Sequence, residues 1–349
     1  MIIDCHGHYT TAPAQHEAWR QEQIEAKGDL SKLAHRHGPQ ISDDEIRESL
    51  ELNQLRLQRE RGTDLTIFSP RAGGMGHHVG DERMNQDWSR LCNDLIKRVC
   101  DLYPENFAPV CQLPQSPGCR PEGVIPELTR CVEELGFIGC NLNPDPSGGR
   151  WTDPPMTDPW WFPLYEKLEE LDVPAMIHVS QSCNPNFHFT GAHYINADTA
   201  VFMQILDSDL FERFPDLKLI IPHGGGAVPY HWGRYRGLAI DRGRLEPAAL
   251  MGDNLYFDTC VYHQPGIDLM AKVVPVDNVL FASEMHGAVR CADPDSGHFF
   301  DDTRRYIETC EYLSDEDRQK IFSGNVRRLY RRLLPAIIAT KTKSETAAR

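Results

Sequence analysis

Several features that would place this 349-residue chain in a familiar class are absent from it. Its 11 cysteines, an odd number, form no CxxC pair and no small-scaffold spacing, so we expect reduced thiols in a cytoplasmic protein. No apolar run approaches the length of a membrane span, and the first residues carry no basic or signal-like segment. Internal repeats and low-complexity segments are also missing. We therefore predict neither a disulfide scaffold nor a membrane partner.

The chain also has fewer basic than acidic residues. The chain has 36 Lys and Arg against 51 Asp and Glu, a net charge of −15, which disfavours nucleic acid and anionic membranes as partners. A small anionic substrate would need arginines concentrated at its site. Because α/β barrels of this length often form one domain, we predict a single domain over residues 1–340 and a flexible tail over 341–349. A homo-oligomer, with a dimer as the first guess, is expected.

Short apolar runs rich in Ile, Val, Leu or Phe recur along the chain, separated by segments long enough for helices. There are eight of them, at residues 1–5, 64–70, 107–113, 137–142, 174–179, 217–222, 254–259 and 279–284. Strands that alternate with helices indicate a parallel sheet, and near-continuous apolar strands indicate that both faces are covered. Eight units favour an α/β fold of the closed (β/α)₈ TIM-barrel type. The competing open doubly wound sheet lacks its glycine-rich dinucleotide turn here.

Polar segments between these runs predict helices and loops. Ser42 and Glu45 form a capping-box pattern that predicts a helix as far as about Arg61, and Gly62 ends it. Asp158 followed by proline predicts another helix start. We also expect inserted loops after strands one, four and five, at residues 13–40, 143–157 and 180–199. The first of these is helix-prone and would form a lid or an interface.

Histidines and a glutamate stand at the ends of several predicted strands. The first strand runs into His6 and His8, which share a side of an extended chain and can face one metal ion, although two solvated histidines are the alternative. His178, His223 and Glu284 follow strands five, six and eight. Because barrel enzymes gather their catalytic groups at these ends, we predict a metal site. Imidazoles and a carboxylate suit zinc first and manganese second.

This order of His-x-His, two later strand-end histidines and a strand-eight acid resembles the amidohydrolase superfamily over nearly the whole chain. The segment Ser323-Gly324-Asn325-Val326 near the end is similar to the branch that holds decarboxylases and hydratases of aromatic breakdown. Binuclear members place a lysine after strand four, where this chain has Asn141 and Asn143, so the resemblance implies one metal ion. Most members end strand eight in aspartate rather than glutamate.

The resemblance implies a hydro-lyase that adds water across a carbon–carbon double bond of a small tricarboxylate. Its metal ligands would be His6, His8, His178 and Glu284. Glu284 would also be the base and His223 the acid, because hydration needs both. The carboxylates would be bound by Arg71 and Arg290, with Tyr194 and His77 as further pocket residues; loop packing is the alternative for His77.

Other readings of the same residues stay open. A decarboxylase of the same branch would use the same histidines and release CO₂. A lactone or amide hydrolase, or a barrel that binds its ligand without turnover, would also retain the fold. The presence of a separate acid and base argues against the last of these.

Overall fold

The computed structural model describes residues 1–187 and 191–333, and its strands form two parallel sheets. The first has the order β1 (Ile3–Tyr9), β2 (Leu65–Pro70) and β3 (Phe107–Pro109). The second runs in chain order through β4 (Cys111–Gln112), β5 (Cys140–Leu142), β6 (Ala175–Ile177), β7 (Leu219–Ile221), β8 (Leu255–Asp258) and β9 (Val279–Leu280).

The two sheets join at both edges into a closed barrel. β3 and β4 are two parts of one run interrupted at Val110, whose backbone N–H donates to the carbonyl of Phe68 on β2 at 2.9 Å. At the other edge the N–H of Cys5 on β1 donates to the carbonyl of Phe281, just after β9, at 2.9 Å. Counting β3 and β4 as one strand gives eight positions around the barrel. The predicted (β/α)₈ fold is therefore confirmed.

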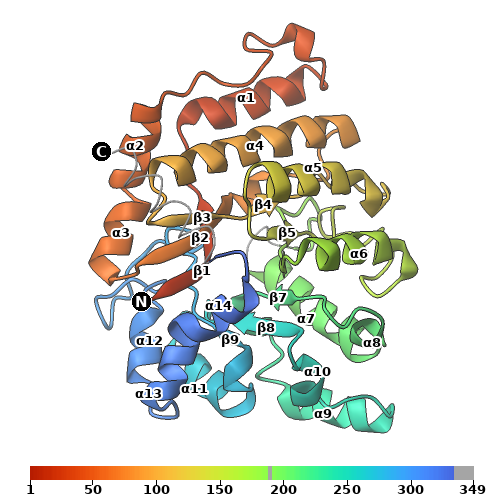
Figure 1. Cartoon of the computed structure of the whole chain (residues 1–349), viewed down its shortest axis with the longest axis vertical. Coiled ribbons are helices and arrows are strands. Elements are labelled where there is room, and N and C mark those ends of the chain that lie inside the picture. Colours follow the sequence, from red (N-terminus) through yellow and green to blue (C-terminus); the bar gives the residue numbers. More distant parts are fainter. Residues whose placement is uncertain (188–190, 334–349) are drawn as a thin grey trace.

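Helices surround the strands as an outer layer (Figure 1). None of those in the described residues is long and apolar enough to cross a membrane. Their bounds are α1 Ala14–Glu25, α2 Asp43–Glu51, α3 Gln54–Arg61, α4 Glu82–Leu102, α5 Ile125–Thr129, α6 Phe162–Leu171, α7 Ala192–Leu206, α8 Leu210–Arg213, α9 Trp232–Asp241, α10 Pro247–Met251, α11 Gln264–Val273, α12 Arg304–Thr309, α13 Asp315–Gln319 and α14 Asn325–Leu329.

Two apolar layers hold this arrangement together. Inside the barrel, side chains from successive strands pack on one another, among them Ile67, Met176 and Ile220, and α14 closes the same cluster with Leu329. A larger cluster fills the space between the strands and the outer helices. Because both faces of each strand are covered, the strands read as near-continuous apolar runs.

The predicted helix starts and stops are found in the structure, but one predicted helix is interrupted. Ser42 and Glu45 form the predicted capping box, Gly62 ends α3 in the left-handed region, and the Asp158 side chain caps the turn before α6. The single helix predicted from 42 to 61 is wrong, because it breaks into α2 and α3 at Asn53. The Asn53 side chain donates to the carbonyl of Ser49 at 2.8 Å and so competes with the helical bonds.

The predicted insertions are partly helical. Residues 13–40 contain α1 and a short 3₁₀ turn at Leu30–Lys32, and α7 begins at Ala192, within the loop expected at 180–199. The single domain stays a prediction. The tail predicted at 341–349 lies outside the described residues.

Candidate metal centre and active-site pocket

A β-bulge directs both histidines of β1 into the mouth of the barrel. Between Asp4 and Gly7 the strand spans one more residue than β2 does between Thr66 and Phe68. Ile3 and Cys5 therefore pack inside the barrel with the interior cluster, and His6 and His8 can still face inward further along. Without the extra residue, the alternation that buries Cys5 would turn both imidazoles outward.

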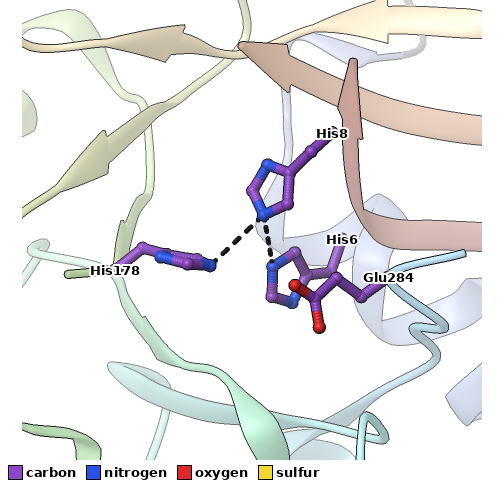
Figure 2. A group of neighbouring side chains, drawn as sticks. All are labelled: His6, His8, His178 and Glu284. Carbon is purple, nitrogen blue, oxygen red and sulfur yellow. Dashed lines mark hydrogen bonds between the residues drawn. The ribbon is translucent and has the colours of Figure 1, made fainter. Parts of the chain in front are cut away.

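The Nε2 atoms of three histidines meet at one point (Figure 2). His8 Nε2 lies 2.9 Å from His6 Nε2 and 3.2 Å from His178 Nε2. The other ring nitrogen of each histidine is held by the protein: His6 Nδ1 donates to Asp258 Oδ2 at 2.8 Å, and His178 Nδ1 donates to the Val179 carbonyl at 2.8 Å. His8 Nδ1 lies 2.7 Å from Ser69 Oγ. Ser69 Oγ has its own acceptor in the Pro70 carbonyl at 3.0 Å, so it can accept from His8. These contacts favour protons on the three Nδ1 atoms, with three Nε2 lone pairs facing one another.

Such a set of donors fits a cation. Lone pairs 2.9 and 3.2 Å apart repel, and a shared metal ion removes the repulsion. Burial, with the neighbouring histidines, lowers the pKa of His8 and His178 well below the ordinary value, so both rings are neutral as ligands must be. Glu284 completes the set, since one of its oxygens and the three nitrogens all lie within 4.8 Å of one another. The His/Glu cluster thus suits a divalent ion.

Glu284 is buried and held in an unusual backbone conformation. Its φ is +48°, in the left-handed region that non-glycine residues rarely occupy, and the φ values of His223 and Tyr262 are +52° and +66°. The Tyr262 hydroxyl donates to Glu284 Oε2 at 2.8 Å. Burial, followed by the charge of Glu284, raises the pKa of Tyr262 well above its ordinary value, so this hydroxyl keeps its proton. Clustered backbone outliers of this kind are typical of functional sites.

His223 lies next to Glu284, and a hydrogen bond to Asp198 holds its ring. Its Nδ1 donates to Asp198 Oδ2 at 2.8 Å, and its Nε2 lies 4.0 Å from Glu284 Oε2. Nε2 is buried and has no hydrogen-bond partner among the described residues. Burial disfavours the charged ring, but the charges of Asp198 and Glu284 outweigh it and raise the pKa of His223 to about 9. His223 can therefore carry a proton at neutral pH.

A cavity of about 360 Å³ opens onto the cluster. His8, His178 and Glu284 line its floor, and both predicted arginines, Arg71 and Arg290, line it as well. Tyr194 also borders this cavity, together with Thr10, Ala72, Gly73, Gln181, Gly287 and Ala288. The only formal positive charges among these lining residues are the two guanidinium groups. The cavity therefore suits a small anion bound next to the cluster.

A model of the family described as Amidohydrolase matches residues 3–332. The chain belongs to the amidohydrolase family. Its branch is indicated by a relative from Sphingobium sp., 2-keto-4-carboxy-3-hexenedioate hydratase, which is 58% identical over 95% of this chain and 97% of its own. The crystal structure of 4-oxalomesaconate hydratase from Rhodopseudomonas palustris is similar, with a TM-score of 0.90, 54% identity and coverage of 99% and 100%.

Decarboxylases of this amidohydrolase family are more distant relatives. Gamma-resorcylate decarboxylase from Polaromonas sp. is 26% identical over 80% of this chain and 86% of its own. The resemblance seen in the sequence is confirmed at the level of the family and of its hydratase relatives.

Not every predicted residue of this amidohydrolase reaches the cavity. His77 is buried behind it, where Nε2 lies 3.0 Å from the Leu113 carbonyl and Nδ1 lies 2.9 Å from the Asn143 side-chain nitrogen. It does not line the cavity, and its contacts are those of loop packing, the alternative reading. Asn141 donates to Ser69 Oγ at 3.1 Å, so it supports the hydroxyl next to His8.

Two contacts of the amidohydrolase site were not predicted from the sequence. Tyr262 follows β8 by four residues, and its position after a strand was the one available signal. Asp198 lies within α7, with nothing in the sequence to connect it with His223. Asp258, the last residue of β8, accepts the hydrogen bond from His6 Nδ1.

Proposed function

We propose that this protein is a zinc-dependent hydratase that converts 4-oxalomesaconate to 4-carboxy-4-hydroxy-2-oxoadipate, in bacterial degradation of lignin-derived aromatics through protocatechuate 4,5-cleavage. Two relatives above 50% identity carry the names of such hydratases. The single observation that carries the proposal is a pair of opposed groups, Glu284, which lines the cavity, and His223, whose buried Nε2 lies next to Glu284. Glu284 Oε2 and His223 Nε2 lie 4.0 Å apart, and hydration of a double bond needs one base and one acid.

In this proposal His6, His8, His178 and Glu284 hold one divalent ion per chain. Three imidazole nitrogens and one carboxylate are a donor set that zinc favours. When bound, the ion acts as a Lewis acid that makes a water molecule more acidic. The hydrogen bonds from His6 to Asp258 and from His178 to Val179 keep the rings oriented for this.

The remaining chemistry belongs to side chains of the protein. Glu284 takes one proton from water as the oxygen bonds to the carbon of the double bond that bears a carboxylate. The electron pair of the double bond moves toward the neighbouring ketone. His223, protonated at Nε2, then gives a proton to the carbon next to that ketone. Because Glu284 and His223 lie 4.0 Å apart, the proton gained by the base can return to the acid and reset the site.

Arg71 and Arg290 bind the substrate carboxylates in this proposal. Both border the cavity, and a guanidinium binds a carboxylate through two parallel hydrogen bonds. A net charge of −15 repels a trianion at long range, so local cations have to overcome this repulsion. Tyr194 packs against His178 with ring centroids 5.3 Å apart and closes one side of the pocket.

The test combines metal analysis with turnover. Purified protein should contain one zinc ion per chain and consume 4-oxalomesaconate with loss of the conjugated absorbance. Glu284→Gln fills the same space but cannot take the proton, so it should bind substrate without hydrating it. Protein with no metal, or with two ions per chain, contradicts the site. Release of CO₂ that Glu284→Gln abolishes would favour a decarboxylase instead. The molecular mass of the same sample, measured by analytical ultracentrifugation, tests the separate expectation of a dimer.

A further inference from the structure

Asp198 is a buried carboxylate that stands behind the site. Its side chain is 2% exposed, and Oδ2 accepts a hydrogen bond from His223 Nδ1 at 2.8 Å. It belongs neither to the His/Glu cluster nor to the lining of the cavity. A buried carboxylate is costly unless a partner compensates it, so its position needs a reason other than packing.

The fold brings Asp198 to His223 through a close approach of two elements. Asp198 lies within α7, and His223 begins the turn that follows β7. The glycines of this turn have positive φ, and a Cβ atom added to Gly226 would lie 2.6 Å from Thr199 Oγ1 and 3.0 Å from Asp198 Cβ. Gly226 therefore allows α7 to pack directly on the turn. Thr199 Oγ1 also accepts from the backbone N–H of Ala227 at 2.9 Å, which fixes the same contact.

The hydrogen bond determines which side of the His223 ring faces the reactants. A carboxylate only accepts, so Nδ1 must carry a proton and Nε2 is the atom left to face Glu284. Without Asp198 the ring is free to turn about its side-chain bonds and to present the wrong nitrogen. Nothing else among the described residues holds Nε2, which has no hydrogen-bond partner there.

We propose that Asp198 is a positioning residue that acts on the reaction only through His223, by fixing its Nδ1 proton and aiming Nε2 at the substrate carbon. This inference rests on the proposed function, in which His223 is the acid. Asp198 neither lines the cavity nor hydrogen-bonds to Arg71 or Arg290, which bind the substrate carboxylates in the proposal. Its loss should therefore impair turnover and leave substrate binding intact. In a site where a misplacement of ~1 Å can cost about 100-fold, Asp198→Asn should lower kcat by at least about 100-fold. KM should stay within about threefold.

A double-mutant cycle tests the inference on the metal-loaded enzyme. Asp198→Asn is compared in the wild-type and the His223→Gln backgrounds, because a residue that acts only through His223 has nothing left to affect in the second. There kcat should change by less than about threefold. An equal loss in both backgrounds, or a wild-type kcat in Asp198→Asn, would overturn the inference. Asp198→Ser passes through the same cycle if the amide variant fails to fold.

A control variant and two further outcomes distinguish a wrong role for Asp198 from a wrong proposed function. Asp207→Asn changes an acid just after the same helix, where it pairs with Arg242 at 2.8 Å, and should leave kcat unchanged. If wild-type enzyme does not hydrate 4-oxalomesaconate, or if His223→Gln retains full turnover, the proposed function or its acid is wrong. If His223→Gln is impaired and Asp198→Asn is not, the positioning role alone is wrong.

Discussion

The hydroxyl of Tyr262 offers a sharp test of how Glu284 is held. Tyr262→Phe removes one oxygen atom and nothing else, and with it the 2.8 Å hydrogen bond to Glu284 Oε2. A hydrogen bond to a charged group contributes about 1.5–3 kcal/mol, and each 1.4 kcal/mol corresponds to about tenfold. We therefore expect kcat/KM to fall by ~10–100-fold. Glu284 is buried and the hydrogen bond is part-buried, so solvent screening should not erase the effect.

The assay is steady-state hydration of 4-oxalomesaconate by metal-loaded enzyme, with metal content and thermal unfolding measured on the same samples. Tyr256→Phe is the matched control, because its hydroxyl donates at 3.2 Å to a neutral carbonyl, that of Asp253, just before β8. It should lose some stability and keep its turnover. Wild-type kcat/KM in Tyr262→Phe with full metal content would refute the assignment of Tyr262 as the support of Glu284.

The remaining predictions concern binding, pH and packing. Arg71→Met or Arg290→Met should raise KM at least about tenfold with metal content unchanged, because each removes a charge-assisted bond; an unchanged KM in both rejects their role. The rate of hydration should fall as pH rises through the pKa of His223, which is raised to about 9, because the acid must be protonated. A bound cation can only lower this pKa, so a rate that still rises above pH 9 would contradict the assignment of His223 as the acid. Gly7→Ala places a methyl group 2.3 Å from the Thr66 side chain and should lower the free energy of unfolding by ~1–3 kcal/mol in urea titrations.

Much of the barrel follows from the sequence, because parallel strands covered on both faces must be apolar along their length. All eight predicted runs overlap strands of the barrel; β1 extends beyond its run as far as Tyr9, and the other strands are shorter than their runs. Residues placed directly after strands, such as His178 and Arg71, could be expected at the same end for the same reason. Local signals such as the Ser42 capping box also act within a few residues and can be recognised without a fold.

Contacts between distant segments could not be predicted in this way. The one-residue bulge in β1, which turns His6 inward, depends on the register with β2 and leaves no pattern in β1 alone. Asp198 reaches His223 from the middle of a helix 25 residues earlier, through a turn that only glycine allows. The break at Asn53 was missed because a side-chain hydrogen bond competes with helix formation there.

The most direct test of water addition is to follow the atoms. Metal-loaded enzyme is incubated with 4-oxalomesaconate in water labelled with heavy oxygen, and product mass and CO₂ are measured together. We expect a product that gains one solvent oxygen on the carboxylate-bearing carbon, with no CO₂ released and no reaction after Glu284→Gln. Release of CO₂ without incorporation of solvent oxygen would contradict it.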